Sequence, residues 1–169
     1  MTDFNTDVMP LKSKFYRLAL RLLNDDAEAQ DITQETLIRL WTRCATLPSA
    51  ADAEKLGLTI TYNLSRDALT RAGRTHEQLD AIDENMTADS SQSPIDSLAE
   101  TDRRQFLRSV IERLPFRQQT AVQLRDIEGK PYKEIADIMQ ITEEQVKITL
   151  FRARQALRNA YKKTDTYEL

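Results

Sequence analysis

The segment from Tyr132 to Leu157, "YKEIADIMQITEEQVKITLFRARQAL", contains neither glycine nor proline. Its apolar residues recur three or four positions apart, which is the spacing of one face of a helix. A tight turn at Met139–Ile141 divides the segment, and Thr142 followed three residues later by Gln145 is the pattern of a helix capping box. We therefore predict two consecutive helices, with the second beginning at Thr142.

The second helix combines an apolar face with a cationic one. Spacings of four, three and four residues predict a buried stripe of Val146, Leu150, Ala153 and Leu157. The same spacing one residue later gives Lys147, Phe151, Arg154 and Arg158, with Arg152 on a flank. A buried hairpin needs the first stripe but not the cations, so we expect an anionic ligand.

This arrangement is typical of a helix-turn-helix whose second helix enters the DNA major groove and reads it near its N-terminal end. Lysine and arginine on such a helix neutralise phosphates or pair with guanine edges. An ordinary helical hairpin with a solvated cationic face would give the same pattern.

The rest of the chain is also predicted to be helical. The 169 residues include only 3 glycines and 5 prolines, fewer turn formers than an all-β fold requires. Residues 5–75 have helical periodicity in Phe15, Leu18 and Leu22, a turn at Asn24–Asp26, and a second break at Pro48. In the next helix, from about 52 to 72, we expect a single apolar side made of Leu56, Ile60, Leu64 and Leu69, ending at Gly73.

Residues 98–160 regain the helical period, first in Phe106, Val110, Ile111 and Leu114, then in Val122, Leu124 and Ile127. Pro115 suits the first position of a helix, and Gly129 suits the end of one. Between the two helical stretches, residues 76–97 have few large apolar side chains, so we predict a linker. The predicted fold is all-α, with two small helical domains, 1–75 and 98–169, joined by an acidic flexible linker.

Charge is segregated along the chain. Asp25 to Glu35 carries five acids and no base, Glu77 to Asp102 carries eight acids and no base, and Gln145 to Thr164 carries six bases and no acid. The net charge of −3 counts weakly against a nucleic-acid binder. Segregated blocks instead indicate local patches that face different partners, although a charge run can also be a solvated face.

Several function classes are disfavoured by what the sequence lacks. His76 and Cys44 are the only histidine and cysteine, and their neighbours supply no catalytic triad, zinc ligand set or phosphate-binding glycine loop. We expect no enzyme activity, cofactor or metal. No run of about 18 apolar residues is present, and the N-terminus does not have the layout of a signal peptide. We therefore expect a cytoplasmic protein without membrane insertion.

Three further features of the sequence are the segments "NDDAEAQDITQETLIRLW" (24–41), "LTITYNLSRDALTRAGR" (58–74) and "LPFRQQTAVQLRDIEGKPYKEIADIMQITEEQVKITLFRARQALR" (114–158). In this order they resemble the bacterial RNA polymerase sigma factors of the extracytoplasmic-function (ECF) class. The first segment is similar to the one that binds the polymerase core, and the second to the helix that reads and melts the promoter. The third resembles the C-terminal promoter-reading domain.

The resemblance implies a sigma factor that directs promoter-specific transcription initiation, with a region 2-like domain at 1–75 and a region 4-like domain at 98–169. It implies core-polymerase contacts through Asp31, Gln34, Glu35 and Arg39. It assigns minus-10 DNA to Asn63, Arg66, Arg71 and Arg74. It assigns minus-35 DNA to Thr142, Glu144, Gln145, Lys147, Ile148, Phe151, Arg152 and Arg154.

The implied partners are the β′ coiled coil and β flap of core RNA polymerase, promoter DNA and an anti-sigma factor. Ile32, Leu40 and Trp41 are interpreted more simply as core residues. Ile148 and Thr149 stand where relatives often have a small polar residue and an arginine, so promoter preference is not transferable. The alternatives are a helix-turn-helix regulator and a sigma-like polymerase-binding protein without promoter-directing activity.

Overall fold

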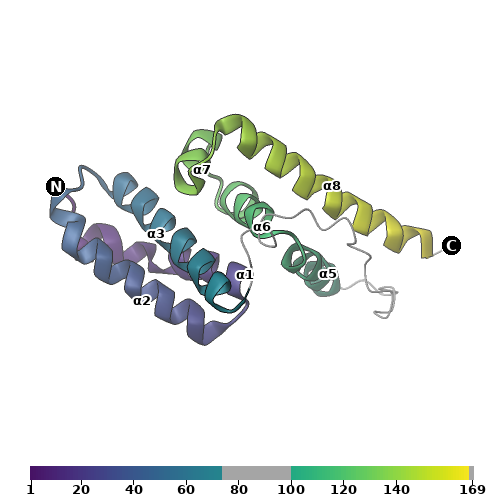
Figure 1. Cartoon of the computed structure of the whole chain (residues 1–169), viewed down its shortest axis with the longest axis horizontal. Coiled ribbons are helices and arrows are strands. Elements are labelled where there is room, and N and C mark those ends of the chain that lie inside the picture. The colour runs from purple at the N-terminus through teal and green to yellow at the C-terminus, as the bar shows by residue number, and fades with distance from the viewer. Residues whose placement is uncertain (74–99, 168–169) are drawn as a thin grey trace.

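The computed structural model describes residues 1–73 and 100–167, and within them every regular element is helical (Figure 1). The long helices are α1 (Lys12–Leu23), α2 (Asp26–Arg43), α3 (Ala50–Arg71), α5 (Glu100–Glu112), α6 (Phe116–Val122), α7 (Tyr132–Met139) and α8 (Glu143–Tyr167). Short helical turns are η1 (Phe4–Val8), η2 (Met9–Leu11), η3 (Cys44–Thr46) and η4 (Gln123–Ile127). The predicted linker, Arg74 and His76 lie outside the described residues.

The helices α1, α2 and α3 form an N-terminal bundle whose ends follow the predicted signals. Asn24 ends α1 in the left-handed conformation at φ 51°, and the Asp25 side chain accepts a hydrogen bond from the Glu28 amide to cap α2. Ser49 caps α3 in the same way through the Asp52 amide. Inside the bundle, Phe15 and Leu40 are fully buried, as the helical spacing predicts.

The predicted core position of Trp41 is wrong, because Trp41 is 61% exposed. Its ring packs edge-on against Phe4 of η1, with 4.9 Å between ring centroids. Ile127, which shares the predicted helical period of Val122 and Leu124, is also 49% exposed. Apolar residues at helical spacing therefore do not all face the interior here.

The predicted apolar side of α3 is only half-buried. Leu56, Ile60, Leu64 and Leu69 are each partly exposed, whereas Leu58 and Tyr62 are 1% exposed. The physical reason is that α3 has neighbours on two sides: α1 and α2 on one, and α7 on the other (Figure 1). A helix covered from two sides has no single buried stripe.

The C-terminal helices α6, α7 and α8 pack around Leu124, Ile135 and Leu150, all at most 1% exposed. Pro115 lies one position earlier than predicted, as the N-cap of α6 instead of its first residue. Two residues in this part have positive φ: Gly129, after η4, at 71°, and Gln140, after α7, at 57°. Gln140 makes the turn between α7 and α8, so the all-α, helix-turn-helix prediction is confirmed.

The two helical parts share one hydrophobic core. A single cluster of buried residues runs from Val8 and Phe15 in the N-terminal bundle to Leu150 and Ala153 in α8. At the junction, the rings of Tyr62 on α3 and Phe116 on α6 lie 5.2 Å apart between centroids. The sequence predicts two modules but gives no signal for this contact.

Candidate functional site

The predicted capping box fixes the start of α8. The Thr142 amide donates to Gln145 Oε1 at 2.9 Å, and the Gln145 amide donates to Thr142 Oγ1 at 3.1 Å. Thr142 and Gln145, which the resemblance assigns to minus-35 DNA, therefore also cap the N-terminus of α8. The first turn carries Glu143 and Glu144, whose charges suit the positive end of the helix dipole.

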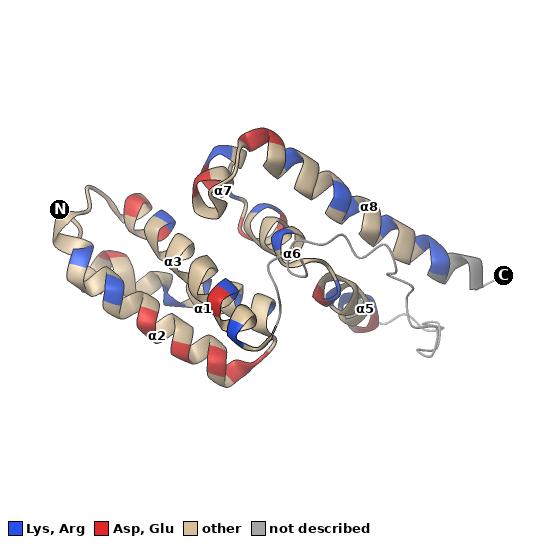
Figure 2. Cartoon of the chain, in the orientation of Figure 1, with Lys and Arg blue, Asp and Glu red and all other residues tan. Residues whose placement is uncertain are grey.

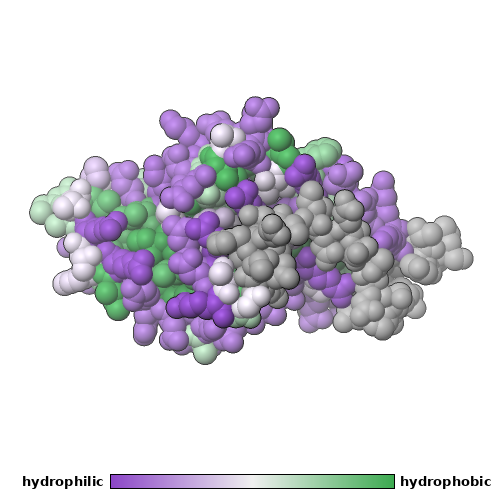
Figure 3. All heavy atoms as spheres, in the orientation of Figure 1, coloured by the Kyte–Doolittle hydropathy of each residue, from purple (hydrophilic) through white to green (hydrophobic). Residues whose placement is uncertain are grey.

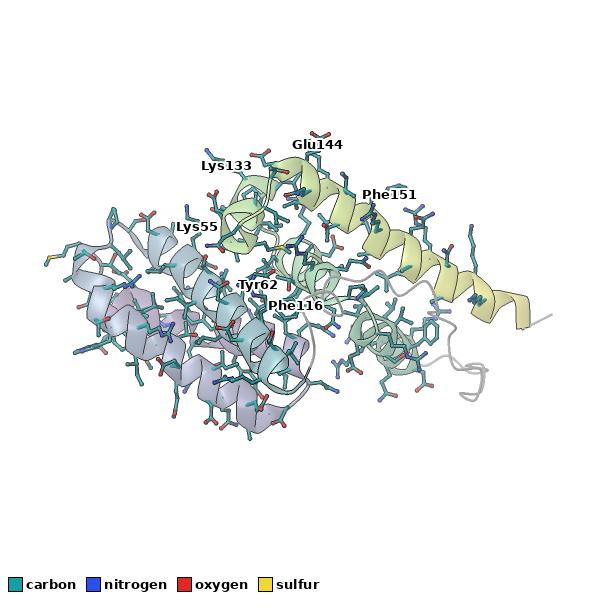
Figure 4. All side chains as sticks on the ribbon, in the orientation of Figure 1. Lys55, Tyr62, Phe116, Lys133, Glu144 and Phe151 are labelled. Atoms are coloured by element: carbon teal, nitrogen blue, oxygen red, sulfur yellow. The ribbon has the colours of Figure 1, made fainter. Side chains whose placement is uncertain are left out.

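Over residues 143–157, the face of α8 opposite its buried stripe carries no basic residue. Val146, Leu150 and Ala153 are at most 1% exposed. At 3.6 residues per turn, the positions in this stretch that point most directly away from them are Glu144, Ile148, Phe151 and Gln155, which we call the outer stripe. Figure 4 shows Glu144 and Phe151 projecting outward from α8. Ile148 and Phe151 are 45% and 61% exposed.

Cations flank the outer stripe on both sides. Lys147 lies on one side and Arg152 on the other, and both are exposed. Basic residues recur along the length of α8 (Figure 2), and the surface over α8 is mainly hydrophilic with a small apolar group (Figure 3). Arg154 differs, because its Nη2 binds Asp126 Oδ1 at 2.7 Å. This hydrogen bond raises the pKa of the Arg154 guanidinium, which stays protonated, and the negative charge of Asp126 offsets its positive charge.

This geometry has the chemistry of major-groove readout. A carboxylate such as that of Glu144 can accept from cytosine N4, and apolar groups such as Ile148 and Phe151 can contact thymine methyls. Cations beside the stripe can bind the phosphates that border the groove.

On α3, two predicted residues lie together. Arg66 Nη2 donates to Asn63 Oδ1 at 3.3 Å, and the Arg66 guanidinium carbon lies 5.5 Å from the centre of the Tyr62 ring. Arg66 Nε is buried and finds no hydrogen-bond partner among the described residues. Arg71 is exposed near the end of α3, and Arg74 is outside the described residues.

On α2, the predicted residues lie along an outward face. Asp31, Gln34 and Arg39 are exposed, and Glu35 pairs with Arg39 at 3.0 Å between Oε1 and Nε. Acidic residues follow one another along α2 in Figure 2. The same side of the helix exposes two apolar residues that the sequence reasoning missed as surface, Ile38 at 58% and Trp41 at 61%. Ile38 lies seven residues after Asp31, and Trp41 lies seven residues after Gln34, which is about two helical turns. This spacing places them on the same face of α2 as the predicted polymerase contacts and could have identified them as exposed.

Comparison with known proteins gives a family match for each of the two helical parts. The sigma-70 region 2 family matches residues 8–75, and the sigma-70 region 4 family matches residues 104–157. The ECF RNA polymerase sigma factor SigM of Bacillus subtilis is 28% identical over 147 residues, covering 86% of this chain and 87% of that protein. The chain belongs to the ECF class of sigma factors.

Other relatives agree with this ECF sigma factor assignment. The RNA polymerase sigma-H factor of Pseudomonas aeruginosa is 26% identical over 164 residues, covering 93% of this chain and 85% of that protein. The ECF sigma factor SigE of Mycolicibacterium smegmatis is 32% identical over 148 residues, covering 86% of this chain but only 56% of that longer protein. Sigma factors direct RNA polymerase to promoters and are initiation factors, not enzymes.

The fold of the ECF sigma factor also matches a solved structure. The sigma factor RpoE of Bartonella quintana, crystallised in complex with the anti-sigma factor NepR, superposes with a TM-score of 0.70 at 20% identity. The match covers 96% of this chain and 98% of that one. Among the described residues of our sigma factor, no group of three or more His, Cys, Asp or Glu is placed to hold a metal ion. No described helix is both long and apolar enough to cross a bilayer.

Proposed function

We propose that three helices of this sigma factor carry three separate binding functions. The outward face of α2 binds core RNA polymerase, α3 reads and melts the minus-10 element, and α8 reads the minus-35 element. The corresponding units are 1–75 and 98–169, joined by residues 76–97. The observation that carries the proposal is the capped N-terminal half of α8, where an outer stripe without basic residues lies between flanking cations.

For the minus-35 element, Lys147 and Arg152 bind phosphates on the two sides of the major groove. Glu144, Ile148 and Phe151 face the base edges between them. Thr142 and Gln145 hold the helix N-terminus at the groove, and the free amide NH₂ of Gln145 can donate to a base or phosphate. Arg154 contributes less, because Asp126 already pairs with it.

For the minus-10 element, Asn63 offers the amide that can form two hydrogen bonds with the edge of a flipped-out base. Arg66 and Arg71 bind the phosphates of the opening strand, and Arg74 is the third proposed phosphate contact. The proposal for Arg66 is supported by its buried, unpartnered Nε, which is a donor that a phosphate oxygen would satisfy.

For the polymerase, the carboxylates Asp31 and Glu35 dock on the β′ coiled coil, with Gln34 and Arg39 at the edges. Exposed Ile38 and Trp41 supply the apolar centre of this contact, which interfaces characteristically have. The β flap is the proposed partner of the C-terminal helices. An anti-sigma partner is supported by the complex formed by the Bartonella quintana relative. The site of action is the cytoplasm, where the polymerase transcribes.

Transcription by core polymerase tests the whole proposal. The purified chain is added to core enzyme on fragmented genomic DNA, and RNA 5′ ends are sequenced. We expect discrete starts that share two sequence elements. A regulator would bind DNA without joining core enzyme, and a polymerase-binding decoy would join core enzyme without producing such starts.

Paired variants test the division of labour. Lys147→Ala with Arg152→Ala should abolish discrete starts while core binding stays at the wild-type level. Glu35→Arg should lower core binding while minus-35 duplex binding persists. The matched control is Lys162→Ala with Lys163→Ala, which removes the same charge from the far end of α8. Equal losses of core binding in both experimental variants would refute the assignment.

A further inference from the structure

The C-terminal half of α2 exposes two apolar side chains, Ile38 at 58% and Trp41 at 61%. Leaving them in water forgoes the stabilisation that burial of their surface would give. Tryptophan is also enriched among the few residues that carry most of the binding energy of a protein interface. The apolar end of α2 therefore has the composition of a binding surface for another protein.

Trp41 does not stand alone on this surface. The ring of Phe4 in η1 lies 4.9 Å from the Trp41 ring between centroids, with 85° between the ring planes. Aromatic quadrupoles favour this edge-to-face arrangement. Phe4 is itself half-buried and packs against the hydrophobic core. The contact thus holds one part of the Trp41 ring and leaves most of the side chain in water.

The turn that carries Phe4 is fastened before and after this residue. The Thr2 hydroxyl donates to the Leu47 carbonyl at 2.9 Å, and Thr2 is only 4% exposed. This bond ties the turn to the connection between α2 and α3, beside the end of α2 (Figure 1). At the start of η1, Asp3 Oδ1 accepts hydrogen bonds from the amide and the hydroxyl of Thr6, both at 2.8 Å. Phe4 is therefore held by contacts that do not involve Trp41.

The apolar surface is continuous with the acidic face that we assign to core polymerase. Ile38 and Trp41 follow Asp31 and Gln34 by about two helical turns. Protein interfaces commonly combine an apolar centre with a polar rim. A ring that is already oriented also loses less conformational freedom on binding than a mobile one. Phe4 precedes the residues matched by the region 2 family, so its contact with Trp41 is a feature of this chain outside the match.

We propose that Phe4 is a positioning residue for polymerase binding. It orients the Trp41 ring, and Trp41 with Ile38 then packs on an apolar surface of core polymerase, next to the contacts of Asp31 and Glu35. This inference rests on the proposed role of α2. It adds η1 to the polymerase-binding part of the chain and gives Phe4 an effect that acts through Trp41.

Affinity of the full chain for immobilised core enzyme gives the first test. Trp41→Ala should weaken binding by at least about thirtyfold, the loss that defines an interface hot spot. Phe4→Ala should weaken it by about threefold to tenfold, because an aromatic pair contributes that much. Phe4→Tyr keeps the ring and should bind as the wild-type chain does. Asn5→Ala changes an exposed neighbour in the same turn and is the matched control.

A double-variant cycle shows whether Phe4 acts through Trp41. In the Trp41→Ala background, Phe4→Ala should add less than about a twofold loss, because the ring that Phe4 orients is gone. Trp41 is the only tryptophan of the chain, so fluorescence of the free chain reports on the environment of this ring. Phe4→Ala should increase the quenching of Trp41 by acrylamide and lower its anisotropy, whereas Asn5→Ala should leave both unchanged.

Three outcomes would overturn the inference. Additive losses in the cycle would mean that Phe4 does not act through Trp41. Unchanged quenching and anisotropy after Phe4→Ala would mean that Phe4 does not hold the ring. Wild-type core binding by the Trp41→Ala chain would mean that the surface has another occupant, and a lower mass in light scattering would then assign it to a second copy of the chain.

Glu35→Arg keeps these outcomes apart from a failure of the proposed function. If Glu35→Arg weakens core binding and Trp41→Ala does not, the polymerase contact of α2 stands without its apolar part. If neither change weakens core binding, the proposed role of α2 is refuted together with the inference.

Discussion

Gly57 lies where α3 packs against Phe15 of α1 and Leu40 of α2. A Cβ atom added there would lie 2.2 Å from Phe15 Cζ and 3.0 Å from Leu40 Cδ1, both in the fully buried core. Alanine favours a helix over glycine by about 0.5–1 kcal/mol, but overpacking a core costs about 1–3 kcal/mol. Gly57→Ala should therefore lower the free energy of unfolding, measured by urea denaturation with far-ultraviolet circular dichroism.

The matched variant adds Phe15→Leu to Gly57→Ala. Leucine lacks the ring atom that the new methyl meets, so the double variant should lose less stability than the two single changes added together. An increase in stability for Gly57→Ala alone would contradict the close approach of α1 and α3.

Ile148 is the residue of the outer stripe that we expect to contact a thymine methyl group. If its side chain covers a thymine methyl, replacing that thymine by uracil in the minus-35 duplex removes about one buried methyl, worth about 0.8 kcal/mol or roughly fourfold in affinity. We expect the wild-type chain to lose this factor at one or two positions and Ile148→Ala to lose none. Titration of the duplexes found by the transcription experiment measures it.

Arg152→Ala is the control for Ile148. A lost phosphate contact should weaken thymine and uracil duplexes equally and reduce the dependence of affinity on salt. Equal wild-type affinity for all uracil-substituted duplexes would mean that Ile148 does not meet a thymine methyl.

At the level of single elements, the capping box is the feature that the sequence specifies most completely. Thr142 Oγ1 accepts from the Gln145 amide at 3.1 Å, and loss of such a cap costs about 1 kcal/mol. Thr142→Val should lower the stability of the chain by that amount and speed hydrogen exchange of the Gln145 amide. Thr149→Val is the control, because the Thr149 hydroxyl only donates to the Gln145 carbonyl within the helix. Equal effects of the two changes would contradict a capping role.

The helices were predicted well because helix ends and buried faces depend on residues that are close together in the sequence. The caps at Asp25 and Ser49 and the buried stripe of Val146, Leu150 and Ala153 follow from neighbours within one or two turns. The burial of Trp41 was predicted wrongly, because periodicity identifies an apolar face without saying what covers it. The assignments of Asn63 and Arg66 came from family resemblance, and their contact with each other depends on the rotamers within α3.

At the scale of the whole molecule, the contact between the two helical parts could not be predicted from the sequence. Its pairs join residues far apart in the chain: Lys55 with Asp137, 82 positions apart, and Arg17 with Glu128, 111 positions apart. Single charges at such separations form no pattern that a helical period would reveal. The prediction of two helical parts agrees with the observed helices. It did not include the contact between these parts.

Glu54 makes this contact sensitive to pH. Burial raises the pKa of its carboxyl group, but hydrogen bonds from Lys130 and Lys14 outweigh burial and hold the pKa below its ordinary value of 4.5. Lys14 binds it from α1 at 2.6 Å and Lys130 from the start of α7 at 2.8 Å. Because the ionised carboxylate binds Lys130 and Lys14 only in the folded chain, the Glu54 pKa is higher in the unfolded chain than in the folded one.

The sign of the effect follows from linkage. A carboxyl group with a lower pKa in the folded form stabilises that form above the ordinary pKa, and this contribution is lost as the pH falls through the depressed value. We expect the contribution of Glu54 to the free energy of unfolding, measured by urea denaturation, to be constant at neutral and weakly acidic pH and to fall below the ordinary pKa of Glu54.

Glu54→Gln separates this residue from the other acids, since it keeps the shape but cannot change charge. The variant should be less stable than the wild-type chain at neutral pH and should lose less stability on acidification. Glu134→Gln removes one charge 3.7 Å from the same Lys130 but leaves the Glu54 pairs with Lys14 and Lys130 in place, so it should behave like the wild-type chain. Identical acid responses of the Glu54→Gln and wild-type chains would show that Glu54 does not stabilise the contact between the two parts.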